Sequence, residues 1–195
     1  MKRPLVISDC DEVLLHMIGP FSDWLGEEHG IDFSLAGNEF HKAMTRRDSG
    51  VKVEPEEVWP LLNGFFDSEM HRQYPIEGSV AGIAKLAENA DVVVLTNLQD
   101  HRAENRTRQL ADHGINLRVF TNQGPKGPAL QAILDEYAPS RAVFIDDLAQ
   151  HHGSVAEIAP HIACAHEAGH AHARIDTWEH ALPWLLERLH GDNDA

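Results

Sequence analysis

Three short apolar runs, far apart in the chain, each stop at a polar residue. They are Leu5-Val6-Ile7 before Asp9, Val92-Val93-Val94-Leu95 before Thr96, and Val143-Phe144-Ile145 before Asp146. Short apolar runs of this kind, bounded by polar residues, are typical of buried parallel strands. The carboxyl ends of such strands meet at one edge of an open α/β sheet, where ligands bind. We therefore expect the polar residues to share one site.

After Asn97 the sequence alternates between helix-like and strand-like patterns. Helices are expected at about 100–113, 127–137 and 150–158, and strands at Leu117–Thr121, Ala142–Asp146 and Ile162–Ala165. An amphipathic helix follows, with apolar positions from Trp178 to Leu189. This alternation predicts a parallel sheet with helices on both faces. The expected fold class is therefore α/β, a Rossmann-like three-layer sandwich around a central parallel sheet.

Between the first strand and the strand that ends at Thr96 lies a long segment whose apolar residues recur at helical spacing. One stripe starts just after Pro55 and consists of Val58, Leu61, Leu62, Phe65 and Phe66. Shorter stripes around Phe21 and at Phe40, Ala43 and Met44 suggest two more helices. The sequence therefore predicts an inserted α-helical domain at 14–76, with a core domain formed by 1–13 and 77–195.

The polar residues near the strand ends include four carboxylates. They are Asp9, Asp11, Asp146 and Asp147. Clustered carboxylates repel one another unless a proton or a cation lies between them, and Mg²⁺ prefers such oxygen ligands, completed by waters and substrate phosphate. Lys126 and the Thr96 hydroxyl add donors suited to a phosphoryl oxygen. A carboxylate can also attack phosphorus, and a second one can move the protons. The sequence therefore predicts a Mg²⁺ site and phosphoryl chemistry.

Four motifs, in this order, resemble those of the haloacid dehalogenase (HAD) superfamily and in particular its phosphatase-type members. The first, DxDx[TV], is matched by Asp9-Cys10-Asp11-Glu12-Val13, and the second, a strand ending in Thr or Ser, by Thr96-Asn97. The third is a lysine, Lys126, and the fourth is the acidic pair Asp146-Asp147 after a strand. The insertion lies where this family carries a small helical cap, between the first and second motifs. The resemblance extends from Leu5 to about Ala165.

The resemblance implies how the first motif acts. Asp9 is expected to be the nucleophile and a Mg²⁺ ligand. Asp11 is expected to be the general acid/base, and its backbone carbonyl is a further metal ligand. Glu12 departs from the pattern, because many family phosphatases have glycine at this position. The bulk and negative charge of Glu12 make this loop different from those of the relatives.

The resemblance also implies roles for the other three motifs. Thr96 and Asn97 are expected to bind the phosphate group. Lys126 is expected to neutralise the charge of the phosphate and of the aspartyl-phosphate. Asp147 is expected to be the remaining metal ligand, with Asp146 in a supporting role.

Two histidine patterns compete with this interpretation. His166-Glu167-Ala168-Gly169-His170 matches the zinc-peptidase pattern HExxH, which requires both histidines on one face of a helix. Because this segment contains a glycine and follows a short strand, we interpret it as a chance match. His151-His152 follow the acidic pair and are expected at a solvated helix start, with contact to the rim of the site as the alternative.

The net charge of −15 disfavours binding to nucleic acid or to an anionic membrane, because both need basic surfaces. No segment has the length and apolar character of a membrane span, and no signal peptide is visible. Cys10 and Cys164 suggest no disulfide framework, and Cys10 is expected to be a packing residue. We therefore expect a cytoplasmic protein whose partner is a small phosphorylated metabolite. The sequence carries no signal for a particular oligomeric state.

The predicted function is Mg²⁺-dependent hydrolysis of a small phosphate monoester through an aspartyl-phosphate, which is the reaction of a phosphoric monoester hydrolase. A phosphomutase would use the same residues, so this alternative stays open. The haloacid dehalogenase reaction also uses an aspartate nucleophile, but that branch needs no metal and lacks an acid at the Asp11 position. A catalytically silent binding or regulatory protein on the same scaffold is the alternative from another class, and the intact pair Asp9 and Asp11 disfavours it.

Overall fold

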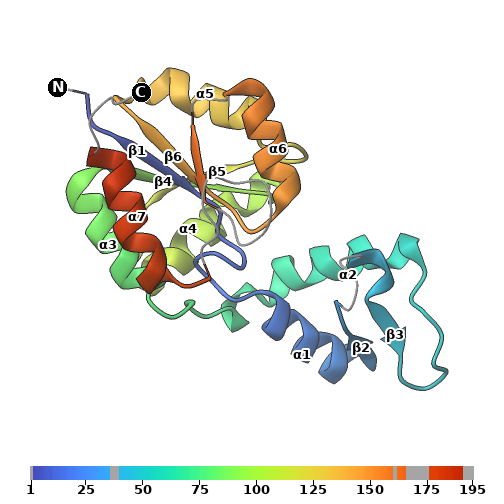
Figure 1. Cartoon of the computed structure of the whole chain (residues 1–195). Coiled ribbons are helices and arrows are strands. Elements are labelled where there is room, and N and C mark those ends of the chain that lie inside the picture. The colour runs from blue at the N-terminus through green and yellow to red at the C-terminus, as the bar shows by residue number, and fades with distance from the viewer. Residues whose placement is uncertain (1, 36–39, 160–161, 166–175, 191–195) are drawn as a thin grey trace. The chain divides into compact units, whose positions relative to one another are not determined.

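The computed structural model of the chain describes residues 2–35, 40–159, 162–165 and 176–190 (Figure 1). The chain divides into two compact units, one made of Met1–Leu15 with Pro75–Ala195 and the other of His16–Tyr74. We call them the core unit and the inserted unit. The insertion predicted at 14–76 is two residues longer at each end than the inserted unit. Within the described ranges, no helix has both the length and the apolar character needed to cross a bilayer.

A five-stranded parallel sheet forms the centre of the core unit, with the strand order β5-β4-β1-β6-β7. The strands are β1 (Leu5–Ser8), β4 (Asp91–Thr96), β5 (Arg118–Thr121), β6 (Ala142–Ile145) and β7 (Ala163–Ala165). Each ends within one residue of its predicted end. The central strand β1 pairs with β4 on one side and with β6 on the other.

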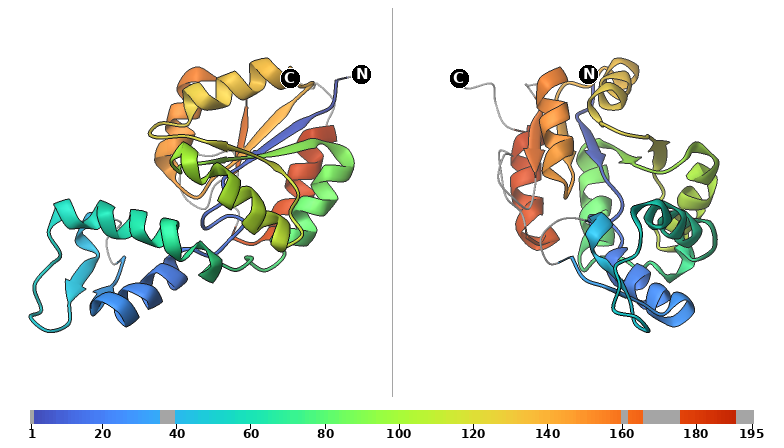
Figure 2. Two further views of the ribbon diagram at one scale, coloured as in Figure 1. Left: turned by 180° about the vertical axis from the view of Figure 1, so that it is seen from behind. Right: turned by 90° about the vertical axis from the view of Figure 1, so that its right-hand side faces the viewer.

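Helices cover both faces of this sheet, as Figures 1 and 2 show. One face carries α3 (Ser79–Asn89), α4 (Ala103–Asp112) and α7 (Trp178–His190), and the other carries α5 (Gly127–Tyr137) and α6 (Ala149–Ile158). A hydrophobic cluster lies on each face of the sheet, and alternate residues of β1 belong to different clusters. Val6 packs on the face that carries α3, α4 and α7, while Leu5 and Ile7 pack on the face that carries α5 and α6. Burial on both faces explains why the strands are apolar at nearly every position. The predicted three-layer α/β sandwich is confirmed.

The inserted unit is built around aromatic side chains. Its elements are α1 (Ile18–His29), β2 (Ile31–Phe33), a 3₁₀ turn (Phe40–Lys42), β3 (Met44–Arg46), α2 (Pro55–Ser68) and a second 3₁₀ turn (Met70–Arg72). The fully buried ring of Phe21 contacts the rings of Trp24, Phe33, Phe40 and Phe65. The helix predicted just after Pro55 begins at that proline, where the missing N–H costs nothing.

The prediction of a purely helical insertion was wrong, because β2 and β3 form an antiparallel pair. Phe33 lies opposite Met44, so Phe40, Ala43 and Met44 do not share one helix. The Ser34 amide donates to the Ala43 carbonyl at 2.8 Å, which extends this pairing. Gly50, with a φ of 68°, then lets the chain turn back after β3. Three-residue strands are too short to show the alternation that distinguishes a strand from a helix.

Candidate active site

Asp9 and Asp146 follow neighbouring strands at the point where the strand order reverses. The chain passes from β1 to β4 on one side of the sheet and later returns to place β6 on the other side of β1. The Asp9 amide donates to the Ile145 carbonyl at 2.8 Å, which continues the ladder one residue beyond β1. Ligands of open α/β sheets bind in the crevice at such a switch point. The fold therefore brings the first and fourth motifs side by side.

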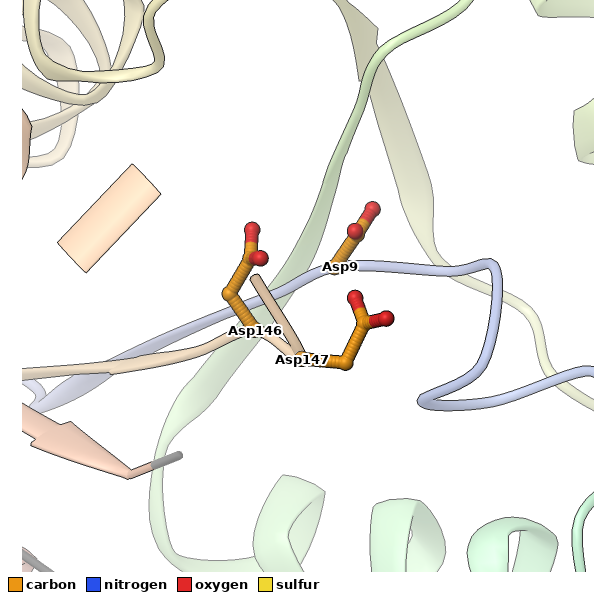
Figure 3. Close-up of side chains that lie close together, drawn as sticks. All are labelled: Asp9, Asp146 and Asp147. Atoms are coloured by element: carbon orange, nitrogen blue, oxygen red, sulfur yellow. The ribbon is translucent and has the colours of Figure 1, made fainter. Parts of the chain in front are cut away.

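Three carboxylates gather there, as Figure 3 shows. Asp9, Asp146 and Asp147 each offer an oxygen that lies within 4.8 Å of those of the other two. Burial raises the pKa of Asp9 to about 6, against the opposing charge of Lys126 and with the help of Asp146. Burial and the charges of Asp9 and Asp146 raise the pKa of Asp147 to about 8. The surroundings therefore do not fully stabilise the negative charge of the three carboxylates. A hard cation bound to their oxygens would offset this charge.

Lys126 is the positive charge within this cluster. Its side chain is fully buried, and Nζ lies 2.9 Å from Oδ2 of Asp9 and 2.6 Å from Oδ2 of Asp146. Burial by itself lowers the pKa of Lys126, but the two carboxylates outweigh it and the pKa is raised. The other oxygen of Asp146, Oδ1, accepts a hydrogen bond from the Leu148 amide at 2.8 Å. Lys126 is therefore charged, and it joins the third motif to the first and the fourth.

The position of Lys126 depends on a close approach between α5 and α6. Gly127 begins α5, and its amide donates to Oγ of Ser154 at 2.8 Å. A Cβ at Gly127 would lie 2.3 Å from the Ser154 carbonyl oxygen, so no other residue fits without moving a helix. The glycine after the lysine therefore fixes where α5 begins.

Thr96 ends β4 on the other side of β1. Its side chain is fully buried, and within the described parts of the chain its Oγ1 has no hydrogen-bond partner. The Thr96 carbonyl, in contrast, accepts hydrogen bonds from the amides of Leu98 and Asn122, both at 3.0 Å. A buried hydroxyl without a partner is costly. Such a group is suited to a ligand that supplies the missing partner.

Asn97 supports the loop that leads to Lys126. Its Nδ2 donates to the Gly124 carbonyl at 3.0 Å, and its Oδ1 accepts from Nδ2 of Asn122 at 2.8 Å. Both polar groups of the side chain are thus engaged by the loop. The sequence suggested phosphate binding for Asn97 and did not anticipate this contact with the loop.

Asp11, two residues after Asp9, lies against an arginine that the sequence analysis did not identify. Nη2 of Arg106, in α4, lies 2.9 Å from Oδ1 and 3.0 Å from Oδ2 of Asp11. Nη1 of the same guanidinium lies 3.2 Å from Sγ of Cys10, which is buried as predicted. The sequence offers only a weak signal, because Arg106 stands four residues before the apolar Leu110 and an arginine at such a position is ordinarily exposed.

The loop after Asp9 holds an unusual backbone conformation. Glu12 has a φ of 56°, which lies in the left-handed region that glycine adopts most easily. Glu12 is also the position at which the first motif departs from the expected pattern. The loop is held further along by Nε1 of Trp178, which donates to the Val13 carbonyl at 2.8 Å. Gly82 leaves room for that indole, since a Cβ there would lie 2.4 Å from the ring.

His151 and His152 are both buried, so the prediction of a solvated helix start was wrong. Nε2 of His152 lies 2.9 Å from the Asp146 carbonyl oxygen and donates to it, which anchors the acidic pair to α6. His151 Nε2 lies 3.5 Å from Nδ2 of Asn97. Burial, together with the charge of Lys126, lowers the pKa of His151 to about 4 and keeps its imidazole neutral. The HExxH pattern at 166–170 lies outside the described residues.

Comparison with known sequences gives no relative, because no family model and no curated protein matches the chain. Solved structures do match. A HAD family hydrolase from Deinococcus radiodurans, with bound phosphate and sodium, has a TM-score of 0.68 at 18% identity, over 94% of this chain and 95% of that one. A candidate phosphoglycolate phosphatase from Lactobacillus plantarum has a TM-score of 0.65 at 14% identity, over 94% and 99%. A candidate β-phosphoglucomutase from Thermotoga maritima has a TM-score of 0.62 at 16% identity, over 96% and 99%.

The superposition with each of these three proteins covers nearly the whole chain, although their sequences differ from it at more than four positions in five. Agreement of this kind concerns the path of the backbone, including the strand order that brings the motif residues together. The chain therefore has the fold of the haloacid dehalogenase superfamily hydrolases, as its four motifs predict.

Proposed function

We propose that this chain is a Mg²⁺-dependent hydrolase of small phosphate monoesters and that Asp9 carries the phosphoryl group as an aspartyl-phosphate. The observation that carries the proposal is the buried ammonium of Lys126 between Asp9 and Asp146, with Asp147 completing the carboxylate cluster. A core that needed only packing would be served better by apolar residues than by this set of charges. The structural neighbours include a candidate phosphatase and a hydrolase with bound phosphate.

The residues present fit a hard divalent cation. Asp9 and Asp147 would hold it through carboxylate oxygens and Asp11 through its backbone carbonyl. Asp146 keeps the supporting role that the resemblance implies, with its two oxygens bound by Lys126 and the Leu148 amide. The oxygens of Asp9 are bound in the same way by Lys126 and the Cys10 amide, so these contacts alone do not rank the two residues as ligands. When bound, the cation would offset the negative charge of the cluster and of the phosphate, so that an anionic nucleophile can approach an anionic substrate.

The chemistry then follows from the positions of the two motif carboxylates. An oxygen of Asp9 attacks phosphorus, the ester P–O bond breaks, and the leaving alkoxide takes a proton from Asp11. Asp11 next removes a proton from a water molecule, which attacks the phosphorus of the aspartyl-phosphate. The bond between phosphorus and the Asp9 oxygen breaks, and the net reaction is ester plus water to alcohol plus phosphate. Asp11 regains its proton in the second step.

Two donors are suited to the phosphoryl oxygens during both steps. Lys126 offers a positive charge that burial keeps close to Asp9. Thr96 offers a buried hydroxyl whose hydrogen-bonding capacity the described residues do not use. Donors held in place before the reaction stabilise developing charge without a cost of reorganisation. They also act locally, against the repulsion between phosphate and a chain of net charge −15.

We further propose a cytoplasmic location and a small phosphorylated metabolite as the partner. The net charge of −15 disfavours nucleic acid and anionic lipid as partners. A phosphomutase is the second candidate, because a candidate β-phosphoglucomutase shares the fold over 96% of this chain. The two activities differ in the acceptor, which is water for the hydrolase and a second substrate hydroxyl for the mutase. Asp11 disfavours a haloacid dehalogenase, and the assay below includes a haloacid as a direct check.

The test is release of inorganic phosphate from p-nitrophenyl phosphate and from a panel of phosphorylated metabolites, with EDTA and with Mg²⁺ restored. Phosphate release that needs Mg²⁺ and disappears in Asp9→Asn supports the hydrolase. Transfer of phosphate between sugar hydroxyls without release indicates the mutase. Activity on a haloacid in EDTA, or no turnover of any substrate, would overturn the proposal, and the second result would indicate the silent scaffold protein.

A further inference from the structure

Arg106 is the largest side chain that is fully buried in the core unit, and its surroundings explain why it is there. Its relative exposure is 0%. A buried guanidinium is costly unless charged and polar partners surround it. Both terminal nitrogens contact the segment that follows β1, Nη2 at the Asp11 carboxylate and Nη1 at the Cys10 sulfur. Arg106 therefore ties α4 to the loop of the first motif.

We propose that Arg106 is a positioning residue that holds the Asp11 carboxyl group in place, so that its protonated form can give its proton to the leaving group, an inference that rests on the proposed function. The geometry fits this role, because a single nitrogen lies 2.9 and 3.0 Å from the two carboxylate oxygens. Both contacts come from one side of the carboxyl group. The side chain of Asp11 is 16% exposed while that of Arg106 is not exposed at all. The arginine thus holds Asp11 from the interior and leaves its other side accessible.

Position matters for this step because an acid must lie within hydrogen-bond reach of the oxygen that it protonates. Aspartate can rotate about two side-chain bonds, and the contacts with Arg106 favour one orientation of its carboxyl group. A displacement of about 1 Å can cost about 100-fold in rate. The loss should be greatest for poor leaving groups, since a good leaving group departs without a proton.

The test is a series of substituted phenyl phosphates, from p-nitrophenyl phosphate to unsubstituted phenyl phosphate, assayed with wild type and Arg106→Met. We expect the variant to lose about 10- to 100-fold more kcat/KM on phenyl phosphate than on p-nitrophenyl phosphate, because kcat/KM reports the step in which the leaving group departs. Arg106→Lys should recover part of the loss, because an ammonium can bind the carboxylate but cannot also reach Cys10. Arg108→Met, an exposed arginine on the same helix, is the matched control and should behave like wild type.

The decisive measurement is a double-mutant cycle with Asp11→Asn. If Arg106 acts through Asp11, Arg106→Met should cost nothing further in the Asp11→Asn background. Equal losses of kcat/KM across the whole series, or losses that add to those of Asp11→Asn, would overturn the proposal and leave a structural role. If Arg106→Met does not fold, Arg106→Lys is taken through the same series and cycle and decides by the same criteria. A wild type that is inactive on every phosphate ester overturns the proposed function itself, and this inference with it.

Discussion

The ammonium group of Lys126 lies 2.6 Å from Oδ2 of Asp146, and both side chains have no exposed surface. The same ammonium lies 2.9 Å from Oδ2 of Asp9, so one cation balances two carboxylates that belong to different strands. Two carboxylates that follow neighbouring strands, β1 and β6, and would otherwise repel each other are thereby held together.

Replacement of this lysine should affect stability as well as activity. Lys126→Met leaves buried carboxylates without their partner, and we expect the free energy of unfolding to fall by about 3–5 kcal/mol. Phosphate release should be lost. Urea denaturation monitored by circular dichroism measures the first effect, and Lys85→Met, at an exposed ion pair with Glu88, is the control with a change below about 0.5 kcal/mol. A Lys126→Met protein as stable as wild type would contradict a charged Lys126.

Asp9→Asn should abolish turnover without unfolding the protein. An amide is a poor nucleophile, and loss of a nucleophile typically costs more than about 10⁴-fold in kcat. Phosphate release under single-turnover and steady-state conditions measures the effect, and the far-ultraviolet spectrum checks the fold. Asp135→Asn, an exposed aspartate on α5, should stay fully active. Activity within tenfold of wild type would remove Asp9 from the role of nucleophile.

In the metal-free protein, the contribution of Asp147 to stability should fall as the pH rises. The pKa of Asp147 is raised from 3.8 to about 8, so the folded state binds the proton more tightly than the unfolded state. The proton-linked stability is fully present below about pH 4 and is lost as the pH rises toward 8. In EDTA, Asp147→Asn should therefore become more stable relative to wild type across this window, as thermal melts at several pH values would show.

Mg²⁺ should reverse this trend, because the ion competes with the protons for the same oxygens. The increase in melting temperature on adding Mg²⁺ should thus be larger at the alkaline end of the same window, and it should be small in Asp147→Asn. An increase that does not depend on pH would show that the ion binds elsewhere.

Glu12→Gly should stabilise the loop after Asp9. The φ of 56° at Glu12 is strained for a side chain and unstrained for glycine, a difference of roughly 1 kcal/mol after the entropy of glycine is subtracted. Glu12→Ala removes the same side-chain contacts but keeps the strain, so it is the matched control. If both variants change the free energy of unfolding equally, the backbone strain at this position does not contribute.

The sheet and most of the candidate site could be predicted because they depend on local patterns. The apolar runs before Asp9, Thr96 and Asp146 are buried on both faces, so their strand character and their ends were visible in the sequence. Parallel pairing then brings the strand ends together by topology alone. Lys126 was found only because its place in the order of motifs was recognised.

Other parts could not be predicted because they depend on tertiary contacts. An arginine in a helix is ordinarily exposed, and Arg106 is buried only because Asp11, 95 residues earlier, supplies its partner. His152 is buried because the Asp146 carbonyl accepts its hydrogen bond. The strands β2 and β3 are stabilised by each other and by the aromatic cluster rather than by their own propensity.

The hydrogen bond from the Trp178 indole to the Val13 carbonyl spans 165 residues, and it sets an order for the assembly of the protein. The loop after Asp9 is synthesised long before Trp178, so one of its anchors leaves the ribosome only after α6 and β7. Such a long-range contact forms late, because the intervening chain must be ordered first. A nascent chain therefore carries Asp9 and Asp11 while the 165 residues up to Trp178 are added, before the loop that holds them can be completed.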